Sequence, residues 1–215
     1  MNFSPFAKTA SRAGGVAAAT VALLLAGAGA ANAAPTKTIT SGHIDAVTVT
    51  CDWNTALGTM EYDAVTTITG NPHGADEVPS GSGIGQIGDY LFVHDESVSA
   101  PAVAWSGGEY AVLTGAGGTI ADIGFSYECD DVRGASTVTI DMANVGALDV
   151  WAFTGAGSTS NTDANVITLT RTGANHHVHG NWYFEAPAHI AYDYELTFNV
   201  NVAAQVTPFN IRVQP

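Results

Sequence analysis

The sequence predicts an all-β fold, an antiparallel β-sandwich of the immunoglobulin-like or jelly-roll-like kind. Two observations support this prediction. Between residues 190 and 202, apolar and polar side chains alternate, which is typical of an antiparallel strand with one buried face. Elsewhere, short segments rich in β-branched and aromatic residues are separated by glycine-rich stretches, and no segment after the N-terminal leader shows a helical period. The pattern favours a sandwich over a βαβ fold.

The N-terminus has the features of a secretory signal peptide. Lys8 and Arg12 precede an apolar run, and residues 31–33 supply the small-x-small pattern at which such peptides are cleaved. We therefore expect a signal peptide at residues 1–33 and a single domain at residues 34–215, which is long enough to bury a core of its own. No later stretch approaches the roughly 20 apolar residues of a membrane span. A secreted, extracellular protein is expected.

Strand signals divide the domain into short segments, each bounded by turn residues. In chain order they are residues 46–53, 60–68, 89–94, 110–114, 120–129, 136–142, 148–153, 165–171, 181–185, 190–202 and 209–213. In the longest of them, Tyr194, Leu196 and Phe198 are expected on the buried face, with Glu195 and Thr197 on the solvent face.

The mature chain is strongly acidic. Removing the signal peptide takes away two of the six basic residues and none of the twenty acidic ones, so the net charge becomes 4 − 20 = −16 with neutral histidines. Nucleic acids and anionic membranes are poor partners for such a charge. It attracts cations, but it also serves the solubility of any secreted protein, so charge alone does not separate these explanations.

Cys51 and Cys129 are the only two cysteines, and both lie in strand-like segments. Because export favours oxidation, we expect a disulfide between them. Closing a loop of this length stabilises a fold by roughly 4–5 kcal/mol in the chain-entropy model. Thiolate metal ligands are the alternative, but the two residues lack the close spacing of zinc modules.

Histidines concentrate near the C-terminal third of the chain. In an extended strand His177 and His179 would point to the same face, so their neutral imidazoles would form half of a metal site. The alternative is an exposed polar strand edge, with the core role belonging to Trp182 and Phe184 on the other face. A β-bulge at Gly180 would re-aim one set of side chains.

The same two-residue spacing recurs at His43 and Asp45. Their odd-numbered series continues through Val47 and Val49, so the pair is expected at the end of a buried face, where a carboxylate needs a partner. A metal ion or backbone hydrogen bonds would supply it. His94, at the end of an apolar run, is the best further ligand candidate because zinc prefers about four ligands; a solvated turn is the alternative.

Zinc is the expected ion, with manganese and copper as alternatives. No Gly-x-Ser-x-Gly elbow and no His-Glu-x-x-His motif occurs in the sequence, so we expect a protein that is not an enzyme. A second hypothesis is a non-catalytic cell-surface adhesion or carbohydrate-binding module in which the histidines are structural. Its sugar-stacking candidate is Trp105.

Residues 42–45 read Gly-His-Ile-Asp, residues 177–184 follow the pattern His-x-His-x-x-Trp-x-Phe, and residues 141–154 precede them. In these segments the chain resembles the actinobacterial surface-anchored domain family called choice-of-anchor M. The resemblance implies a cell-envelope role in metal capture or delivery, beside an ABC transporter of the zinc or manganese type. It also implies four ligands, namely His43, Asp45, His177 and His179.

The resemblance has two departures. Residues 187–189 read Pro-Ala-His where the family has Pro-Gly, and the usual C-terminal anchor is missing. We therefore expect a protein that is freely secreted or held at the envelope by a partner.

Overall fold

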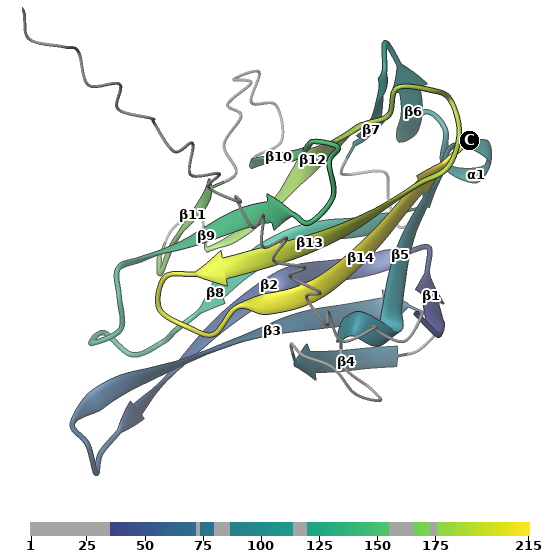
Figure 1. Cartoon of the computed structure of the whole chain (residues 1–215). Coiled ribbons are helices and arrows are strands. Elements are labelled where there is room, and N and C mark those ends of the chain that lie inside the picture. The colour runs from purple at the N-terminus through teal and green to yellow at the C-terminus, as the bar shows by residue number, and fades with distance from the viewer. Residues whose placement is uncertain (1–34, 72–73, 80–86, 114–119, 155–165, 173–175) are drawn as a thin grey trace, which may run out of the picture. The chain divides into compact units, whose positions relative to one another are not determined.

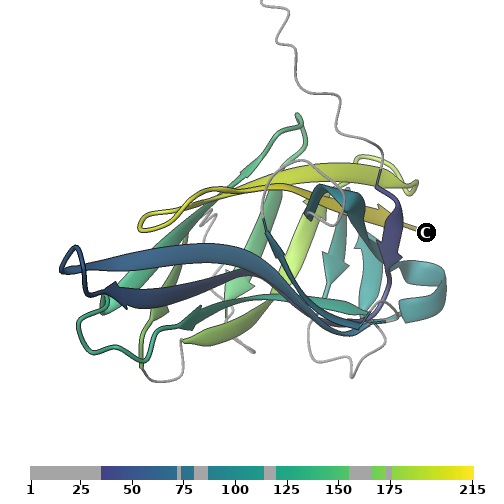
Figure 2. The same ribbon diagram turned by 90° about the horizontal axis from the view of Figure 1, so that it is seen from below.

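Two β-sheets packed face to face confirm the predicted all-β sandwich (Figures 1 and 2). The strands are β1 (Lys37–Ile39), β2 (Gly42–Asn54), β3 (Thr59–Asn71), β4 (Gly74–Pro79), β5 (Tyr90–Asp95), β6 (Val103–Ser106), β7 (Glu109–Val112), β8 (Ala121–Glu128), β9 (Thr137–Asn144), β10 (Val150–Thr154), β11 (Val166–Thr170), β12 (His177–Glu185), β13 (Tyr192–Val200) and β14 (Val206–Gln214). Two short helices, η1 (Ile87–Asp89) and α1 (Glu96–Ser99), flank β5.

This computed structural model describes residues 35–71, 74–79, 87–113, 120–154, 166–172 and 176–215. All of them belong to one compact unit, residues 32–215. The signal peptide expected at residues 1–33 lies outside the described residues. Within the described part of the chain, no helix has the length and apolar character needed to cross a bilayer.

One sheet has the strand order β1-β5-β14-β13-β9-β11, and the other has the order β4-β3-β2-β8-β12-β7-β6, with β10 also paired to β12. Every segment predicted from the sequence overlaps one of these strands. The strands that the pattern did not indicate, β1, β4 and β6, all lie at sheet edges. The sheets are mixed, because β2 pairs in parallel with β8, and β5 pairs in parallel with both β1 and β14.

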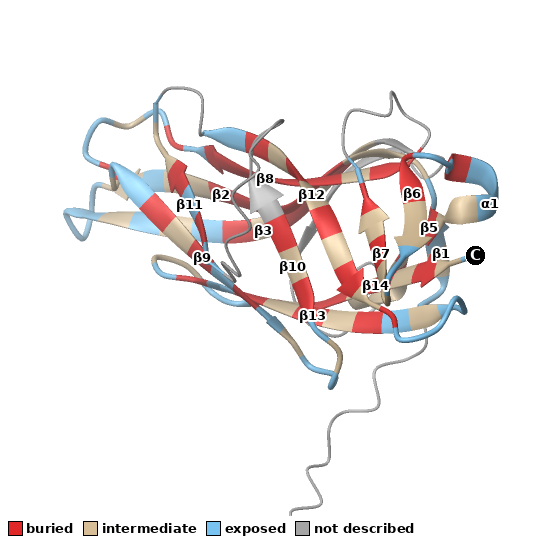
Figure 3. Cartoon of the chain, turned by 90° about the horizontal axis from the view of Figure 1, so that it is seen from above, coloured by how far each residue is buried: buried red, intermediate tan, exposed pale blue. Residues whose placement is uncertain are grey.

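The core lies between the sheets, and burial alternates along the strands that face it (Figure 3). Phe125 of β8 contacts both Trp182 of β12 and Phe198 of β13, with ring centroids 5.9 and 5.6 Å apart. Phe92 of β5 stacks on Phe209 of β14 at 4.4 Å. These large apolar side chains hold β8 and β12 firmly against the opposite sheet, which makes their outer face a rigid platform.

The predicted disulfide between Cys51 and Cys129 is present. It ties β2 to the residue that follows β8, one position beyond the paired residues Thr50 and Glu128. The bond therefore reinforces the parallel pairing of two strands that, as described below, both contribute to the candidate site.

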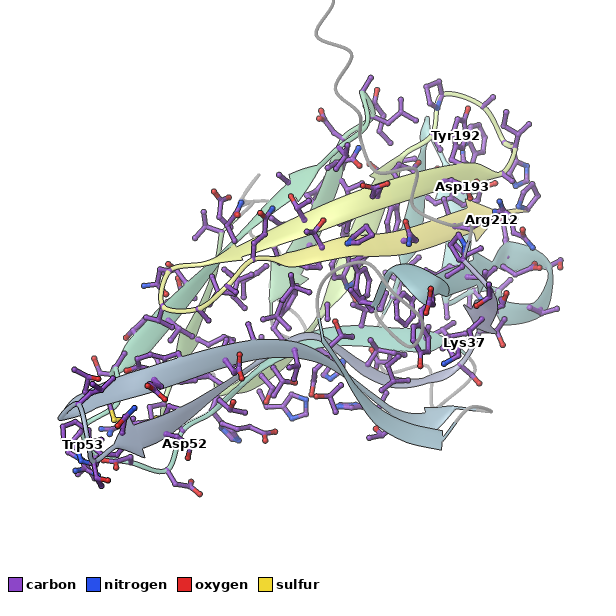
Figure 4. The ribbon with its side chains drawn as sticks, turned by 60° about the horizontal axis from the view of Figure 1, so that its bottom comes forward. Lys37, Asp52, Trp53, Tyr192, Asp193 and Arg212 are labelled. Atoms are coloured by element: carbon purple, nitrogen blue, oxygen red, sulfur yellow. A yellow bond between two sulfur atoms is a disulfide. The ribbon has the colours of Figure 1, made fainter. Side chains whose placement is uncertain are left out.

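Each of the described arginines has a partner close to it in the structure. On the opposite sheet, Arg212 of β14 makes two hydrogen bonds to the carboxylate of Asp193 of β13, at 2.6 and 2.7 Å (Figure 4). At the tip of the β2–β3 hairpin, Arg133 stacks over Trp53 and binds Asp131. Arg171 donates to the carbonyl oxygen of Asp131 at 2.7 Å.

Candidate metal centre

The central strand β8 separates the two strands that carry the candidate ligands. Asp45 of β2 and His179 of β12 are both paired with the same residue of β8, Gly124. Paired residues on adjacent strands point to the same side of a sheet. Asp45 and His179 therefore face each other across Gly124 on the outer face of the sheet.

The other two candidate ligands lie one row to either side. His43 of β2 pairs with Asp122 of β8, and His177 of β12 pairs with Ser126 of β8. Because side chains two residues apart in a strand share a face, His43 lies beside Asp45, and His177 lies beside His179. The register thus gathers four side chains from two strands that are separated by about 130 residues of sequence.

The face expected for β2 needs a correction, because the strand contains a β-bulge at Ala46. Between Asp45 and Val47, β2 gains one residue relative to β8, and the pairing with β3 shifts at the same place. The bulge reverses the alternation, so Val47 enters the core while His43 and Asp45 face outward. The bulge carbonyl of Ala46 accepts a hydrogen bond from the buried hydroxyl of Thr66 at 2.9 Å.

Strand β12 has no such irregularity in any of its pairings, Gly180 included. Along this strand Trp182 and Phe184 are buried, whereas His177 and His179 lie on the other face. The face assignment made from the sequence is therefore correct for β12.

Gly124 makes room for an imidazole. A Cβ atom at this position would lie 2.7 Å from both Cδ2 and Cε1 of His179, and 2.6 Å from the carbonyl oxygen of Val178. The ring of His179 thus lies directly against the backbone of β8. Glycine within a strand often marks such a close approach.

The four donor atoms converge. The Nε2 atom of His177 is 3.1 Å from Oδ1 of Asp45 and 3.1 Å from Nε2 of His179. The Nε2 atoms of His43 and His179 are each 3.6 Å from the same Oδ1 atom. Taken together, one donor atom from each of the four residues lies within 4.8 Å of every other.

Hydrogen bonding accounts for only part of this arrangement. A single proton on Nε2 of His177 can be donated to Asp45 or to His179, but not to both. The Nε2 atoms of His43 and His179, at 3.6 Å, are too far from Oδ1 of Asp45 for a normal hydrogen bond. Within the described residues, the ionic contacts of Asp45 are all with histidine. A cation between the four atoms would satisfy all of them at once.

The group has a buried side and an accessible side. The side chains of Asp45 and His179 are 6% and 17% exposed, whereas those of His43 and His177 are 40% and 37% exposed. Burial lowers the pKa of His43, and the neighbouring histidines lower it further, whereas the charge of Asp45 opposes the shift. A lowered pKa keeps the ring neutral, which is the form that coordinates a metal.

His94 lies outside this group. It belongs to β5 of the opposite sheet and points into the core on the same face as Phe92, with its ring 6.2 Å from that of Phe184. Neither ring nitrogen of His94 has a hydrogen-bond partner among the described residues. Burial lowers its pKa to about 4, so the ring is neutral at physiological pH.

Trp105, the sugar-stacking candidate, is half-buried and makes contacts within the fold. Its indole nitrogen donates to the carbonyl oxygen of Ala186 at 3.0 Å, and its ring stacks on that of His189 at 5.2 Å. His189, in turn, contacts the carboxylate of Glu96 at 2.7 Å. This cluster secures the loop between β12 and β13 against α1.

Two residues of the site carry only a weak sequence signal. Asp122 and Gly124 interrupt an apolar strand at alternate positions, next to the buried Ile123. A polar residue and a glycine on one face of a strand are typical of any solvent-facing position. The cross-strand register is what relates them to the histidines.

No protein-family model, no curated protein and no solved structure matches the chain. The resemblance to choice-of-anchor M stays a prediction, and the functional argument rests on the site itself.

Proposed function

We propose that this protein is a secreted binding protein for a divalent transition metal, zinc above all, which captures the ion outside the cell. The observation that carries the proposal is the convergence of His43, Asp45, His177 and His179, whose donor atoms lie within 4.8 Å of one another. Delivery to a metal ABC transporter, or to another envelope component, is the physiological role that the resemblance to choice-of-anchor M supports.

The spacing of the donors suits a small tetrahedral ion. With zinc bonds of about 2.0–2.1 Å, neighbouring donors of a tetrahedron lie about 3.3–3.4 Å apart. The contacts of Asp45 with the three histidines, and that between His177 and His179, span 3.1–3.6 Å. These four spacings are close to those of a tetrahedral zinc site, and the two remaining pairs, which join His43 to His177 and His179, lie within 4.8 Å.

The chemistry of the donors orders the candidate metals. Three imidazole nitrogens and one carboxylate oxygen suit zinc and copper, whereas manganese and calcium favour sites made mainly of oxygen. Copper binds most nitrogen sites more tightly than zinc does, so geometry and supply, rather than raw affinity, separate the two ions. We place zinc first because Oδ1 of Asp45 lies 3.1–3.6 Å from a nitrogen of each of the three histidines, close to the donor spacing of a tetrahedral zinc site.

A binding role suits the site better than catalysis. Catalytic zinc sites commonly have three protein ligands and keep a fourth position for water or substrate, whereas closed sites use four protein ligands. Here four side chains each offer one donor atom, and these atoms lie within 4.8 Å of one another. Export is supported by the N-terminal sequence and by the disulfide, since such bonds persist in oxidising compartments.

Native mass spectrometry tests the proposal. The mature chain, purified without a histidine tag and stripped with a chelator, is mixed separately with zinc, copper, manganese and calcium. We expect uptake of one zinc ion per chain, and loss of this uptake in the double variant His177→Ala/His179→Ala.

The matched control is His189→Ala, which removes a histidine that is exposed and ion-paired but lies outside the group. This variant should take up zinc as the wild type does. If the wild type takes up none of the four metals, the proposal fails. The adhesion or carbohydrate-binding module with structural histidines would then be the better account.

A further inference from the structure

Asp122 lies beside the proposed metal centre without belonging to the four donors. It occupies the outer face of β8, two residues before Gly124 and in the same row as His43. Its Oδ1 atom is 3.2 Å from Nδ1 of His179. Both atoms are buried, and neither makes a hydrogen bond to any described residue, because the 3.2 Å contact between them is not aligned as one. Each is nevertheless within hydrogen-bonding distance of the other, so a small rotation of the ring or the carboxylate would join them.

The ring nitrogen that faces Asp122 is not the one that faces the metal centre. Nε2 of His179 points toward Asp45 and His177, and Nδ1 points toward Asp122. A neutral imidazole carries one proton, so Nε2 can bind an ion only when the proton is on Nδ1. A buried N–H group without an acceptor is costly, and Asp122 carries the carboxylate that could accept from Nδ1 across the 3.2 Å contact.

The backbone holds both partners in place. Asp122 and Gly124 belong to the central strand of the platform, and His179 lies against Gly124 because no side chain separates them. On the other side of Gly124, Ser126 lies beside His177, but its hydroxyl donates to Glu128 at 3.2 Å. The arrangement therefore fixes the orientation of one histidine, His179, which is the least exposed of the three.

We infer that Asp122 is a positioning residue of the centre, which holds the proton of His179 on Nδ1 and leaves Nε2 free for the ion. Carboxylates that accept the second N–H of a metal-bound histidine orient the ring and raise its basicity. The inference deepens the proposed function and rests on it for the effect on metal affinity. Its effect on the tautomer of His179 holds in the metal-free protein as well.

The first test compares Asp122→Ala with Glu128→Ala. Both variants remove one carboxylate from the outer face of β8, but Glu128 is exposed and does not contact a histidine of the group. In a competition titration with a zinc chelator, Asp122→Ala should bind one zinc with an affinity about 10–100-fold lower. Glu128→Ala should bind with the affinity of the wild type. Equal affinities for wild type and Asp122→Ala, or equal losses in both variants, would overturn the inference.

The second test needs no metal. Nitrogen-15 NMR of the metal-free protein at pH 8 reports which ring nitrogen of His179 carries the proton. We expect protonation of Nδ1 in the wild type and a shift toward Nε2 in Asp122→Ala. A wild-type protein with the proton on Nε2 would contradict the inference. If the expected tautomer shift occurs but the wild type takes up no zinc, the proposed function fails while the positioning role of Asp122 stands.

Discussion

A single methyl group at position 124 should disable the candidate centre. In Gly124→Ala the new Cβ atom would lie 2.7 Å from two ring carbons of His179 and 2.6 Å from the carbonyl oxygen of Val178. Ordinary van der Waals contact begins at about 3.4 Å, so the ring must move by 3.4 − 2.7, or 0.7 Å, at least. Metal–ligand bonds tolerate errors of only about 0.2 Å. The displaced His179 can then no longer complete the set.

Two measurable losses follow from this displacement. Removing a residue that supports a zinc ligand commonly lowers zinc affinity about 10–100-fold. Displacing the ligand His179 itself should lower the affinity at least as much. The free energy of unfolding should also fall by roughly 1–3 kcal/mol, the usual cost of overpacking, because the backbone of β12 has to shift as well. Chelator competition measures the first loss, and urea unfolding of the metal-free protein measures the second.

Gly146→Ala is the matched control. There the nearest atom to an added Cβ is the side-chain nitrogen of Asn144, at 3.3 Å, and this residue lies outside the metal centre. This variant should keep the zinc affinity of the wild type. If Gly124→Ala also keeps it, then the close approach of His179 to β8 is not required for binding, and the construction of the site described above is wrong.

Three further predictions concern protons and the disulfide. Zinc affinity should fall as the pH drops below about 6.5, because protonated imidazoles do not coordinate, and uptake that persists unchanged at pH 5 in native mass spectra would contradict histidine ligation. Burial lowers the pKa of His94 to about 4 from 6.5, so the unfolded chain takes up a proton in this window and the folded chain does not. The free energy of unfolding is therefore highest above pH 6.5 and should drop by roughly 3 kcal/mol toward pH 4, a drop that His94→Leu should reduce in urea titrations at both pH values. Cys51→Ser/Cys129→Ser should lower the free energy of unfolding by about 4–5 kcal/mol while the folded fraction still takes up one zinc, and an unchanged urea midpoint would contradict the first part.

The fold was predictable where the chain repeats a simple period. In β13 the side chains of Tyr194, Leu196 and Phe198 are buried as the alternation indicates, and in β12 the same rule separates the histidines from Trp182 and Phe184. Edge strands such as β1 and β6 escaped prediction because they are short and need little apolar surface. The parallel pairing of β2 with β8 was also beyond reach, since no local pattern encodes which distant strands become neighbours.

The candidate site was predictable as a set of ligand types but not as a geometry. Two-residue spacing identified His43 with Asp45, and His177 with His179, as pairs that share a face. His94 looked equivalent in the sequence, yet it belongs to the opposite sheet and points into the core. A histidine at a strand end faces solvent or the core according to which side of the strand it lies on. His94 lies on the same side of β5 as the buried Tyr90 and Phe92.

Two departures from regular β-structure lie at this site, namely the bulge at Ala46 and the glycine at position 124. Both help to bring the four donor side chains together. Without the bulge at Ala46, Asp45 would share the face of Val47 and lie in the core, where an unpaired carboxylate is costly. Without a glycine at position 124, His179 could not lie across β8 toward Asp45. Neither feature improves the sandwich itself, because a bulge interrupts pairing and a glycine weakens a strand. Proteins commonly break such local rules at functional sites, so the coincidence of both at the four donors favours selection for a ligand over chance clustering.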